Sequence, residues 1–322
     1  MKLLLTGGTG FFGKSLLRHW LAMQRKGLNV PDVFVLSRTP DSFLEFHSEF
    51  VNLSWLRFAK GDVLDSASLP RRERFTHVLH AASDSTLGPL LTPLQQYDQI
   101  VNGTRNVLDY AIKVGARKFL FTSSGAAYGN QPAQFERMPE DWLGMPDPLN
   151  PAMAYGVAKR AAEHLCVLYN NAYGLETVIA RCFAFVGPDL PLDAHFAIGN
   201  FIRDALKRDV ITVSGDGTSL RSYLYQDDLA KWLDILLVKG EAGHAYNIGS
   251  DHAVSIAELA RLVRDELAPG KQLRILGQTE DRVARNRYVP SIDKARAMGL
   301  KPLVPLQEAI RRSAQGSMSY GY

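Results

Sequence analysis

Short apolar runs recur along roughly the first 185 residues, and longer segments with apolar residues at helical spacing separate them. An uninterrupted run of about five apolar residues is typical of a strand that is covered on both faces of a parallel sheet. We predict strands at 2–6, 33–37, 56–60, 77–81, 118–123 and 177–183, and helices at 11–26, 95–115 and 153–173. This alternation predicts an α/β fold with a doubly wound parallel sheet.

The pattern changes after about residue 185, where "VGPDLPLDAHFAIGNF" is rich in Pro, Gly and Asp and the elements become shorter. A second glycine-rich turn, "SGDGTSLRS", lies in this part of the chain. We therefore predict a large domain over residues 1–184 and a smaller C-terminal α/β lobe over residues 185–322. Part of the lobe can return to the sheet of the large domain.

The stretch "TGGTGFFG" lies between the first predicted strand and the first predicted helix, and three of its four glycines have the spacing Gly-x-x-Gly-x-x-Gly. Gly7, Gly10 and Gly13 allow a tight turn, a close approach of a ligand, and packing of the helix on the sheet. The free N–H groups of the helix N-terminus, which begins at Phe11 and Phe12, favour an anion. The turn predicts a Rossmann-type site for the pyrophosphate of a dinucleotide.

The end of the second strand bears on which dinucleotide binds. NAD sites place an Asp or Glu there, on the ribose 2′-hydroxyl. This chain has Ser37 and Arg38 instead, and a guanidinium can hold a 2′-phosphate. We predict NADP(H), with NAD(H) as the alternative if Arg38 points to solvent. Asp62, after the third strand, either accepts a hydrogen bond from adenine or is an ordinary turn residue.

Two stretches, "FTSSGAAYG" and "AMAYGVAKRAAEHL", contain candidate catalytic residues. Tyr155 and Lys159 are four residues apart and therefore share one helical face. A lysine cation beside a phenol stabilises the phenolate and brings its pKa down from about 10 towards neutrality. A hydroxyl such as that of Ser124 can orient a reacting carbonyl or alcohol. The set predicts proton transfer coupled to hydride transfer with nicotinamide.

The composition of the chain limits the kinds of partner that we expect it to bind. The 322 residues carry a net charge of +4 without a Lys/Arg block, and no apolar stretch approaches the length of a membrane span. Cys166 and Cys182 lie in apolar segments, which predicts buried thiols and no metal cage. No signal peptide is apparent before the first strand. We expect a cytoplasmic protein that binds neither nucleic acid nor membrane, and no metal.

The chain resembles the extended short-chain dehydrogenases/reductases of the nucleotide-sugar epimerase/dehydratase/reductase group. The resemblance is carried, in the family's order, by "TGGTGFFG", "GDVLD", "HVLHAAS", "NGTRNVLDYA", "FTSSGAAYG", "YGVAK", "GDGTSLRSYLYQDDLA" and "YNIGS". It implies that Tyr155 is the catalytic acid or base, that Lys159 anchors the nicotinamide ribose, and that Ser124 is the catalytic hydroxyl. It also implies cofactor contacts from Asp62, Val63, Ala81, Ala82 and Ser83.

The same resemblance implies that the C-terminal lobe binds a nucleotide-diphosphate sugar. Arg221 matches an arginine on the diphosphate, and Asn200 matches an asparagine on the nucleotide side. Arg282 or Arg287 would add a second diphosphate contact. A homodimer through the helices around 95–115 and 153–173 is a further expectation from the family.

Departures from the family pattern limit the reaction. The dehydratases carry an Asp-Glu pair directly after the catalytic hydroxyl residue, where this chain has Gly125 and Ala126. Ala184 and Ile100 replace two asparagines that are common in the family, which weakens the case for a standard UDP-galactose epimerase. Our prediction is an NADPH-dependent reductase of a nucleotide-activated 4-keto-6-deoxyhexose. The alternatives are a nucleotide-sugar 4-epimerase, a non-catalytic cofactor-binding protein and a ketoreductase of small apolar substrates.

Overall fold

The structure is a computed structural model that describes residues 1–71, 73–83, 90–278 and 286–319. The described chain forms two compact units. Unit 1 contains residues 1–127, 145–181 and 230–246, and unit 2 contains residues 128–144, 182–229 and 247–322. The chain therefore passes between the units several times. That the first part binds the cofactor and the second the substrate stays a prediction.

Unit 1 is built on a seven-stranded parallel sheet with the strand order β11-β6-β5-β4-β1-β2-β3. The strands are β1 (Lys2–Thr6), β2 (Asp32–Ser37), β3 (Leu56–Lys60), β4 (His77–His80), β5 (Lys118–Ser124), β6 (Glu176–Cys182) and β11 (Ala245–Ile248). Strand β1 pairs with β2 on one side and with β4 on the other. The order reverses at this point, which is where open α/β sheets form a crevice for ligands.

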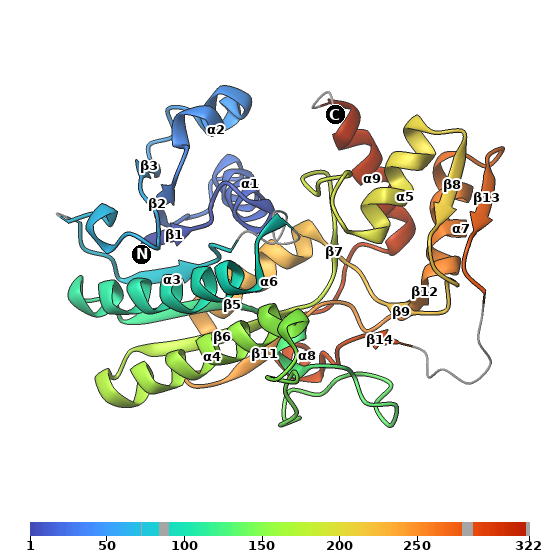
Figure 1. The fold of residues 1–322 in the computed structure, drawn as a ribbon. Helices are drawn as coiled ribbons and strands as arrows, with labels where there is room; N and C mark the ends of the chain where they lie inside the picture. The colour runs from blue at the N-terminus through green and yellow to red at the C-terminus, as the bar shows by residue number, and fades with distance from the viewer. Residues whose placement is uncertain (72, 84–89, 279–285, 320–322) are drawn as a thin grey trace. The chain divides into compact units, whose positions relative to one another are not determined.

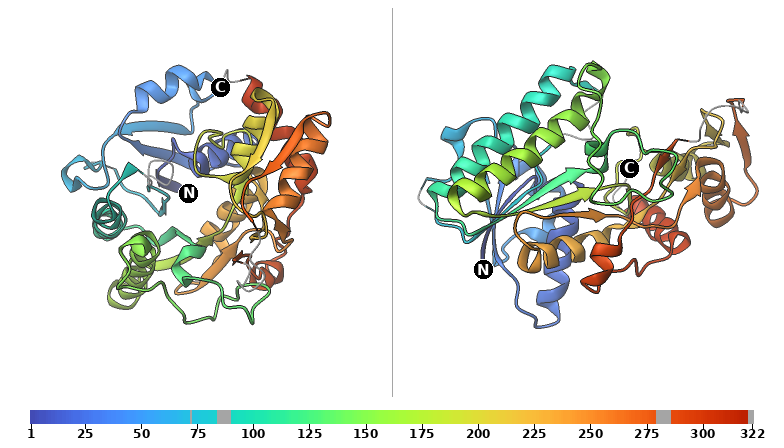
Figure 2. Two further views of the ribbon diagram at one scale, coloured as in Figure 1. Left: turned by 45° about the vertical axis from the view of Figure 1, so that its right-hand side comes forward. Right: turned by 90° about the horizontal axis from the view of Figure 1, so that it is seen from below.

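Helices cover both faces of this sheet, as Figures 1 and 2 show. The helices α3 (Pro93–Lys113) and α4 (Ala154–Tyr173) lie side by side on one face. The helices α1 (Phe11–Arg25) and α6 (Gln226–Lys239) lie on the other, where Trp20 donates a hydrogen bond to Asp234 at 2.9 Å. The short α2 (Pro40–Phe46) follows β2. The homodimer expected through α3 and α4 stays a prediction.

The apolar runs of the sequence form the core. Leu3, Leu4 and Leu5 of β1 have no exposed surface, and Phe119 to Phe121 of β5 are equally buried. Both faces of these strands are covered, so that apolar residues are required at consecutive positions. Helix α3 begins at a capping box, in which Thr92 accepts from the N–H of Gln95 and Gln95 accepts from the N–H of Thr92.

The described residues of unit 2 form three small sheets, ordered β10-β7, β12-β9-β14 and β13-β8. Its strands are β7 (Phe185–Val186), β8 (Val210–Val213), β9 (Leu220–Arg221), β10 (Leu224–Tyr225), β12 (Val254–Ser255), β13 (Gln272–Ile275) and β14 (Arg287–Tyr288). Its helices are α5 (Ala197–Lys207), α7 (Ile256–Leu267), α8 (Asp293–Ala297) and α9 (Leu306–Ser319). Helix α5 packs against α7 and α9.

The predicted doubly wound sheet is confirmed, with element ends that differ by one or two residues. Strand β11 was not predicted, and neither were the two-residue strands of unit 2. Both cysteines are buried free thiols, and burial raises the pKa of Cys166. Within the described ranges no helix is long and apolar enough to cross a membrane.

Candidate cofactor and catalytic site

The glycine turn lies between the carboxyl ends of β1 and β4. Gly7 has a φ of +74°, and a Cβ on it would lie 2.5 Å from the carbonyl carbon of Ala81. A Cβ on Gly13 would lie 2.2 Å from the Cα of Gly8. Neither position leaves room for a side chain, because the turn packs against the end of β4 and helix α1 packs against the turn.

The N-terminus of α1 is open for an anion. Gly10 is its N-cap, and in the described chain no side chain caps it and its first turn holds no acidic residue. Phe11 and Phe12 are half-buried at the start of this helix. The first N–H groups and the positive end of the helix dipole therefore suit a pyrophosphate. These residues fit the dinucleotide that the glycine pattern predicts.

Ser37 and Arg38 stand beside this turn at the end of β2. The Ser37 hydroxyl lies 3.4 Å from the hydroxyl of Thr9 and accepts from the N–H of Thr39 at 3.2 Å. Ser37 is buried, whereas Arg38 is exposed. The strand end thus offers a hydroxyl and a guanidinium and no carboxylate, which suits a 2′-phosphate better than a free 2′-hydroxyl.

The other predicted cofactor contacts follow β3 and β4. Asp62 uses one carboxylate oxygen to accept from the N–H of Leu64 at 2.9 Å, which is the turn role that the sequence left open. Val63 is buried and packs near Gly103 of α3. Ala81, Ala82 and Ser83 are half-buried and follow β4 directly at the sheet crevice.

His80 is a buried polar residue whose role the sequence analysis missed. Its Nδ1 lies 2.7 Å from the Thr6 hydroxyl and its Nε2 lies 3.2 Å from that of Thr104. Burial, and then the charge of Lys159, lowers the pKa of His80 to about 3, so the ring is neutral. Through these two contacts His80 links Thr6 at the end of β1 and the end of β4 to Thr104 of α3. A histidine inside the apolar run "HVLHA" was the signal for it.

The three predicted catalytic residues come from β5 and α4 in unit 1. Ser124 ends β5, and its hydroxyl accepts from the N–H of Ala126 at 3.1 Å. Tyr155 is half-buried in the first turn of α4. Lys159 is buried, donates to the carbonyl of Thr122 at 2.9 Å and lies 5.8 Å from the ring centre of Tyr155. The cation is thus held beside the ring of Tyr155, as the predicted pairing of these two residues requires.

Glu163 continues the face of α4 that carries Tyr155 and Lys159. One of its oxygens accepts from the hydroxyl of Ser123 at 2.6 Å and from Nε of Arg181 at 3.0 Å. The other accepts from Nη2 of Arg181 at 2.8 Å. The end of β5 is therefore tied to α4 through Lys159 and through Glu163. The spacing of four residues was the sequence signal for Glu163, but its partners come from other strands.

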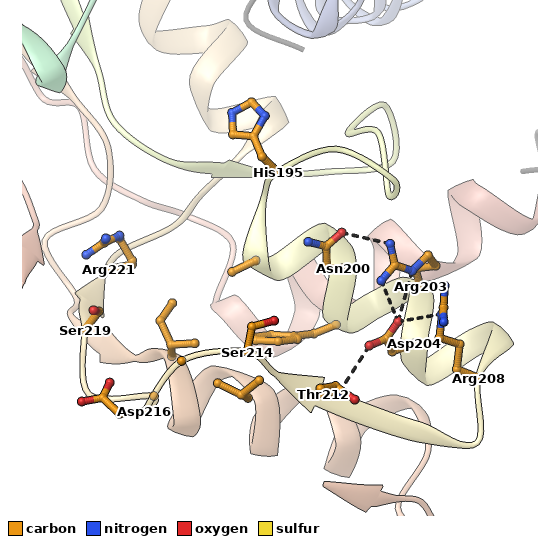
Figure 3. A pocket seen from close by; sticks show the side chains of 16 residues that line it. His195, Asn200, Arg203, Asp204, Arg208, Thr212, Ser214, Asp216, Ser219 and Arg221 are labelled. Carbon is orange, nitrogen blue, oxygen red and sulfur yellow. Dashed lines mark hydrogen bonds and ion pairs between the residues drawn. The ribbon is translucent and has the colours of Figure 1, made fainter. Parts of the chain in front are cut away.

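Unit 2 contains a pocket of about 550 Å³, shown in Figure 3. Two predicted substrate residues, Asn200 and Arg221, line it. Arg221 donates to the carbonyl of Leu220 at 2.8 Å, and its guanidinium lies 6.0 Å from the ring centre of Tyr288. The sequence analysis missed Arg203 and Arg208, which also line the pocket. Arg282 lies outside the described residues.

Known proteins resemble the chain over nearly its whole length. UDP-glucuronic acid decarboxylase 4 of Arabidopsis thaliana is 30% identical over 311 residues, which are 96% of this chain and 67% of that protein. A double mutant of DesIV, a dTDP-glucose 4,6-dehydratase from Streptomyces venezuelae solved with NAD, has a TM-score of 0.83 at 25% identity and covers 99% of this chain and 97% of its own. RMD from Pseudomonas aeruginosa, solved with NADPH, has a TM-score of 0.79 at 25% identity and covers 99% of both chains.

A family of known proteins matches most of the chain. The family described as "NAD dependent epimerase/dehydratase family" matches residues 3–249, which include the glycine turn, Ser124, Tyr155 and Lys159. The match agrees with the resemblance that the sequence motifs carry. The chain belongs to the NAD dependent epimerase/dehydratase family.

Proposed function

We propose that the chain is an NADPH-dependent reductase of a nucleotide-activated 4-keto-6-deoxyhexose. The observation that carries the proposal is the buried Lys159, which lies beside Tyr155 and donates to the carbonyl of Thr122, two residues before Ser124 at the end of β5. Neither residue directly after Ser124 is a carboxylate, so the site has no acid or base at that point for the elimination of water.

Each of these side chains has a role in reducing a ketone. The Ser124 hydroxyl donates to the C4 carbonyl oxygen and orients it. Tyr155 gives its phenolic proton to that oxygen as the carbon–oxygen double bond becomes a single bond. Lys159 stabilises the phenolate that remains until solvent returns the proton. A reduced nicotinamide, when bound, supplies the hydride.

The choice of NADPH rests on the end of β2. Ser37 is hydrogen-bonded within the turn and Arg38 is exposed beside it, so that a 2′-phosphate would find a guanidinium and no repelling carboxylate. A consumed reductant suits a net reduction, whereas a reaction without net redox change needs only a resident cofactor. RMD is a relative solved with NADPH, and DesIV is one solved with NAD.

A nucleotide-diphosphate sugar is the proposed substrate because of the pocket in unit 2. Arg203, Arg208 and Arg221 give it three guanidinium groups, of which the buried Asp204 engages two. Among the described residues Arg221 has no carboxylate partner. Its Nη1 donates to the carbonyl oxygens of Leu220 and Asn286 at 2.8 and 3.3 Å, so its positive charge is not neutralised and favours a diphosphate. The named relatives, a UDP-glucuronic acid decarboxylase and a dTDP-glucose 4,6-dehydratase, support this substrate class.

The second candidate is a reaction in which the hydride leaves the sugar and returns to it. Epimerisation at C4 is one such reaction and was the alternative drawn from the sequence. The 30% identity to a UDP-glucuronic acid decarboxylase over 96% of the chain favours decarboxylation as another. Both would leave the total amount of reduced cofactor unchanged.

The test is the absorbance of NADPH during incubation with a dTDP-4-keto-6-deoxyhexose, with UDP, GDP and CDP analogues in parallel. The reductase is supported when NADPH falls by one molecule for each molecule of ketone. It is refuted when no ketone consumes NADPH while UDP-glucose is epimerised or UDP-glucuronic acid releases CO₂. Tyr155→Phe is the control, because it keeps the fold and removes the proton donor.

A further inference from the structure

The carboxamide of Asn200 has a defined orientation in the unit 2 pocket. Nη1 of Arg203 donates to Oδ1 of Asn200 at 3.1 Å. Arg203 stands three residues after Asn200 in α5, so the two side chains are neighbours on one face of the helix. Figure 3 shows the carboxamide nitrogen turned away from Arg203 and into the pocket.

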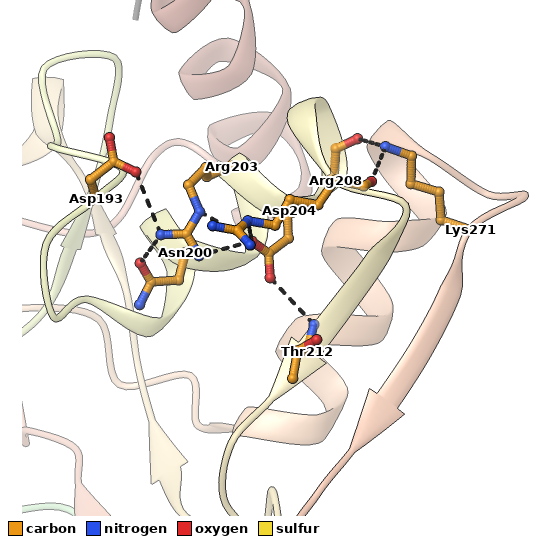
Figure 4. A network of polar contacts seen from close by, with 8 residues as sticks. Asp193, Asn200, Arg203, Asp204, Arg208, Thr212 and Lys271 are labelled. Atoms are coloured by element: carbon orange, nitrogen blue, oxygen red, sulfur yellow. Dashed lines mark hydrogen bonds and ion pairs between the residues drawn. The ribbon is translucent and has the colours of Figure 1, made fainter.

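Arg203 is itself held in place from two sides. Its Nε and Nη2 donate to one oxygen of Asp204 at 3.1 and 2.8 Å, and its Nη1 lies 3.5 Å from a carboxylate oxygen of Asp193. Asp204 is buried, and its second oxygen accepts from the N–H of Thr212 in β8 at 3.4 Å. Figure 4 shows this network running from α5 to β8. The guanidinium is therefore fixed before any ligand binds.

An arginine donates hydrogen bonds and accepts none, so it can only face the oxygen end of an amide. Its presence excludes the flipped carboxamide, in which Nδ2 would meet the guanidinium. Within the described residues, Nδ2 of Asn200 donates to no protein atom. The pocket thus presents two N–H donors at this position and no acceptor.

We propose that Arg203 is a positioning residue that fixes Asn200 as a hydrogen-bond donor to an acceptor oxygen of the nucleoside diphosphate. The inference rests on the proposed nucleotide substrate. It assigns to Arg203 an action through Asn200, while Arg221 meets the phosphates. An Asn200 side chain without Arg203 could turn its oxygen towards the ligand and repel the oxygen that it should bind.

A double-mutant cycle tests this, with affinities for UDP, dTDP, CDP and GDP measured by calorimetry. For the nucleotide that binds tightest, Asn200→Ala and Arg203→Met should each weaken binding by about tenfold. The double variant should bind within about twofold of Asn200→Ala, because Arg203 has nothing left to position. Arg203→Lys keeps a donor for Asn200 and should stay within about threefold of the unsubstituted protein.

Contrary outcomes separate the two proposals. An equal loss from Arg203→Met in the presence and absence of Asn200 would overturn the inference, since Arg203 would then contact the ligand itself. So would unaltered binding by Arg203→Met. Failure of the unsubstituted protein to bind any of the four nucleotides would overturn the proposed substrate. NADPH affinity monitors folding, and Arg203→Leu, which also carries no hydrogen-bond donor, replaces Arg203→Met if the latter does not fold.

Discussion

Gly156 follows Tyr155 in α4 and packs against the backbone that follows Ser124. A Cβ at this position would lie 2.6 Å from the carbonyl oxygen of Ala126 and 2.7 Å from Cγ of Pro146. Ala126 belongs to the 3-10 turn Gly125–Tyr128, and its N–H binds the hydroxyl of Ser124. The substitution Gly156→Ala therefore inserts a methyl group between the segments that carry Tyr155 and Ser124.

The size of the effect follows from these distances. A carbon and a carbonyl oxygen normally lie no closer than about 3.3 Å. The methyl group needs about 0.7 Å more than the structure provides at the Ala126 oxygen, and Pro146 is too close to it as well. A misplacement of about 1 Å in a catalytic group can cost about 100-fold in rate. We expect turnover to fall by about 10- to 100-fold.

Stability should change less than turnover does. Overpacking costs about 1–3 kcal/mol, and alanine is favoured over glycine in a helix by about 1 kcal/mol. The net loss should therefore be about 2 kcal/mol or less, and a native fold should remain. NADPH affinity should change little, because the glycine turn and the end of β2 do not contact Gly156.

The assay compares the rate of NADPH consumption, NADPH affinity and the melting temperature of Gly156→Ala with those of Gly270→Ala. Gly270 is the matched control, because a Cβ on it would meet nothing within 4 Å and its φ is not positive. Turnover within threefold of the unsubstituted protein, with an unaltered melting temperature, would show that α4 is not held against Ala126 as tightly as the contacts imply.

Three further predictions concern single side chains of unit 1. Tyr155→Phe should lower turnover by at least about 100-fold with nearly unaltered NADPH affinity; retained turnover would remove Tyr155 as the proton donor. Arg38→Ala should weaken NADPH binding by about 10- to 100-fold and hardly affect NADH, and equal losses would show that Arg38 does not contact the 2′-phosphate. Burial, and then Lys159, holds the pKa of His80 near 3, below its usual value of about 6.5, so the unfolded chain takes up this proton first. Its contribution to stability should be complete above about pH 6.5 and fall at up to about 1.4 kcal/mol per pH unit towards pH 3. Urea unfolding at pH 7 and pH 5 should show a smaller difference for His80→Gln than for the unsubstituted protein.

The sheet could be predicted because its strands are buried on both faces. Such strands need apolar residues at consecutive positions, and the runs ending at Thr6 and His80 meet that need locally, whereas the edge strand β3 exposes Arg57 and Lys60. Strand β11 could not be predicted in this way. It is a four-residue segment, Ala245–Ile248, that becomes a strand by pairing at the edge of a sheet whose other strands come much earlier in the chain. Its pairing is a tertiary effect with little local signal.

In the candidate site too, the residues defined by local spacing could be predicted and those defined by tertiary contacts could not. Tyr155 and Lys159 could be predicted because helical spacing alone places them on one face. Glu163 shares that spacing, but its function depends on Ser123 and Arg181, which the fold brings to it from β5 and β6. The contact of Arg203 with Asn200 depends on the conformations of both side chains, and neither periodicity nor motif spacing determines them.

Gly125 and Ala126 say more about which reactions are excluded than the predicted catalytic residues Ser124, Tyr155 and Lys159 do. Ser124, Tyr155 and Lys159 suit any hydride transfer at an oxygen-bearing carbon. Elimination of water from C5 and C6 needs in addition an acid for the hydroxyl group and a base for the proton on C5, and neither residue directly after Ser124 supplies one. Decarboxylation next to a C4 ketone needs no base, because the carbonyl takes up the electrons of the broken bond, but C5 must then receive a proton.

Besides a hydride from the reduced cofactor, reduction of a ketone needs only one proton, which we propose comes from Tyr155, so it makes the smallest demand on the residues present. If the oxidised cofactor exchanges after each reaction, the same residues perform a net reduction. If it stays bound, they can only return the hydride that they removed. The rate at which the oxidised cofactor dissociates, relative to turnover, therefore decides between the two candidate functions. Measuring both rates would separate them, and Arg38 and the glycine turn are the residues that we propose set the affinity.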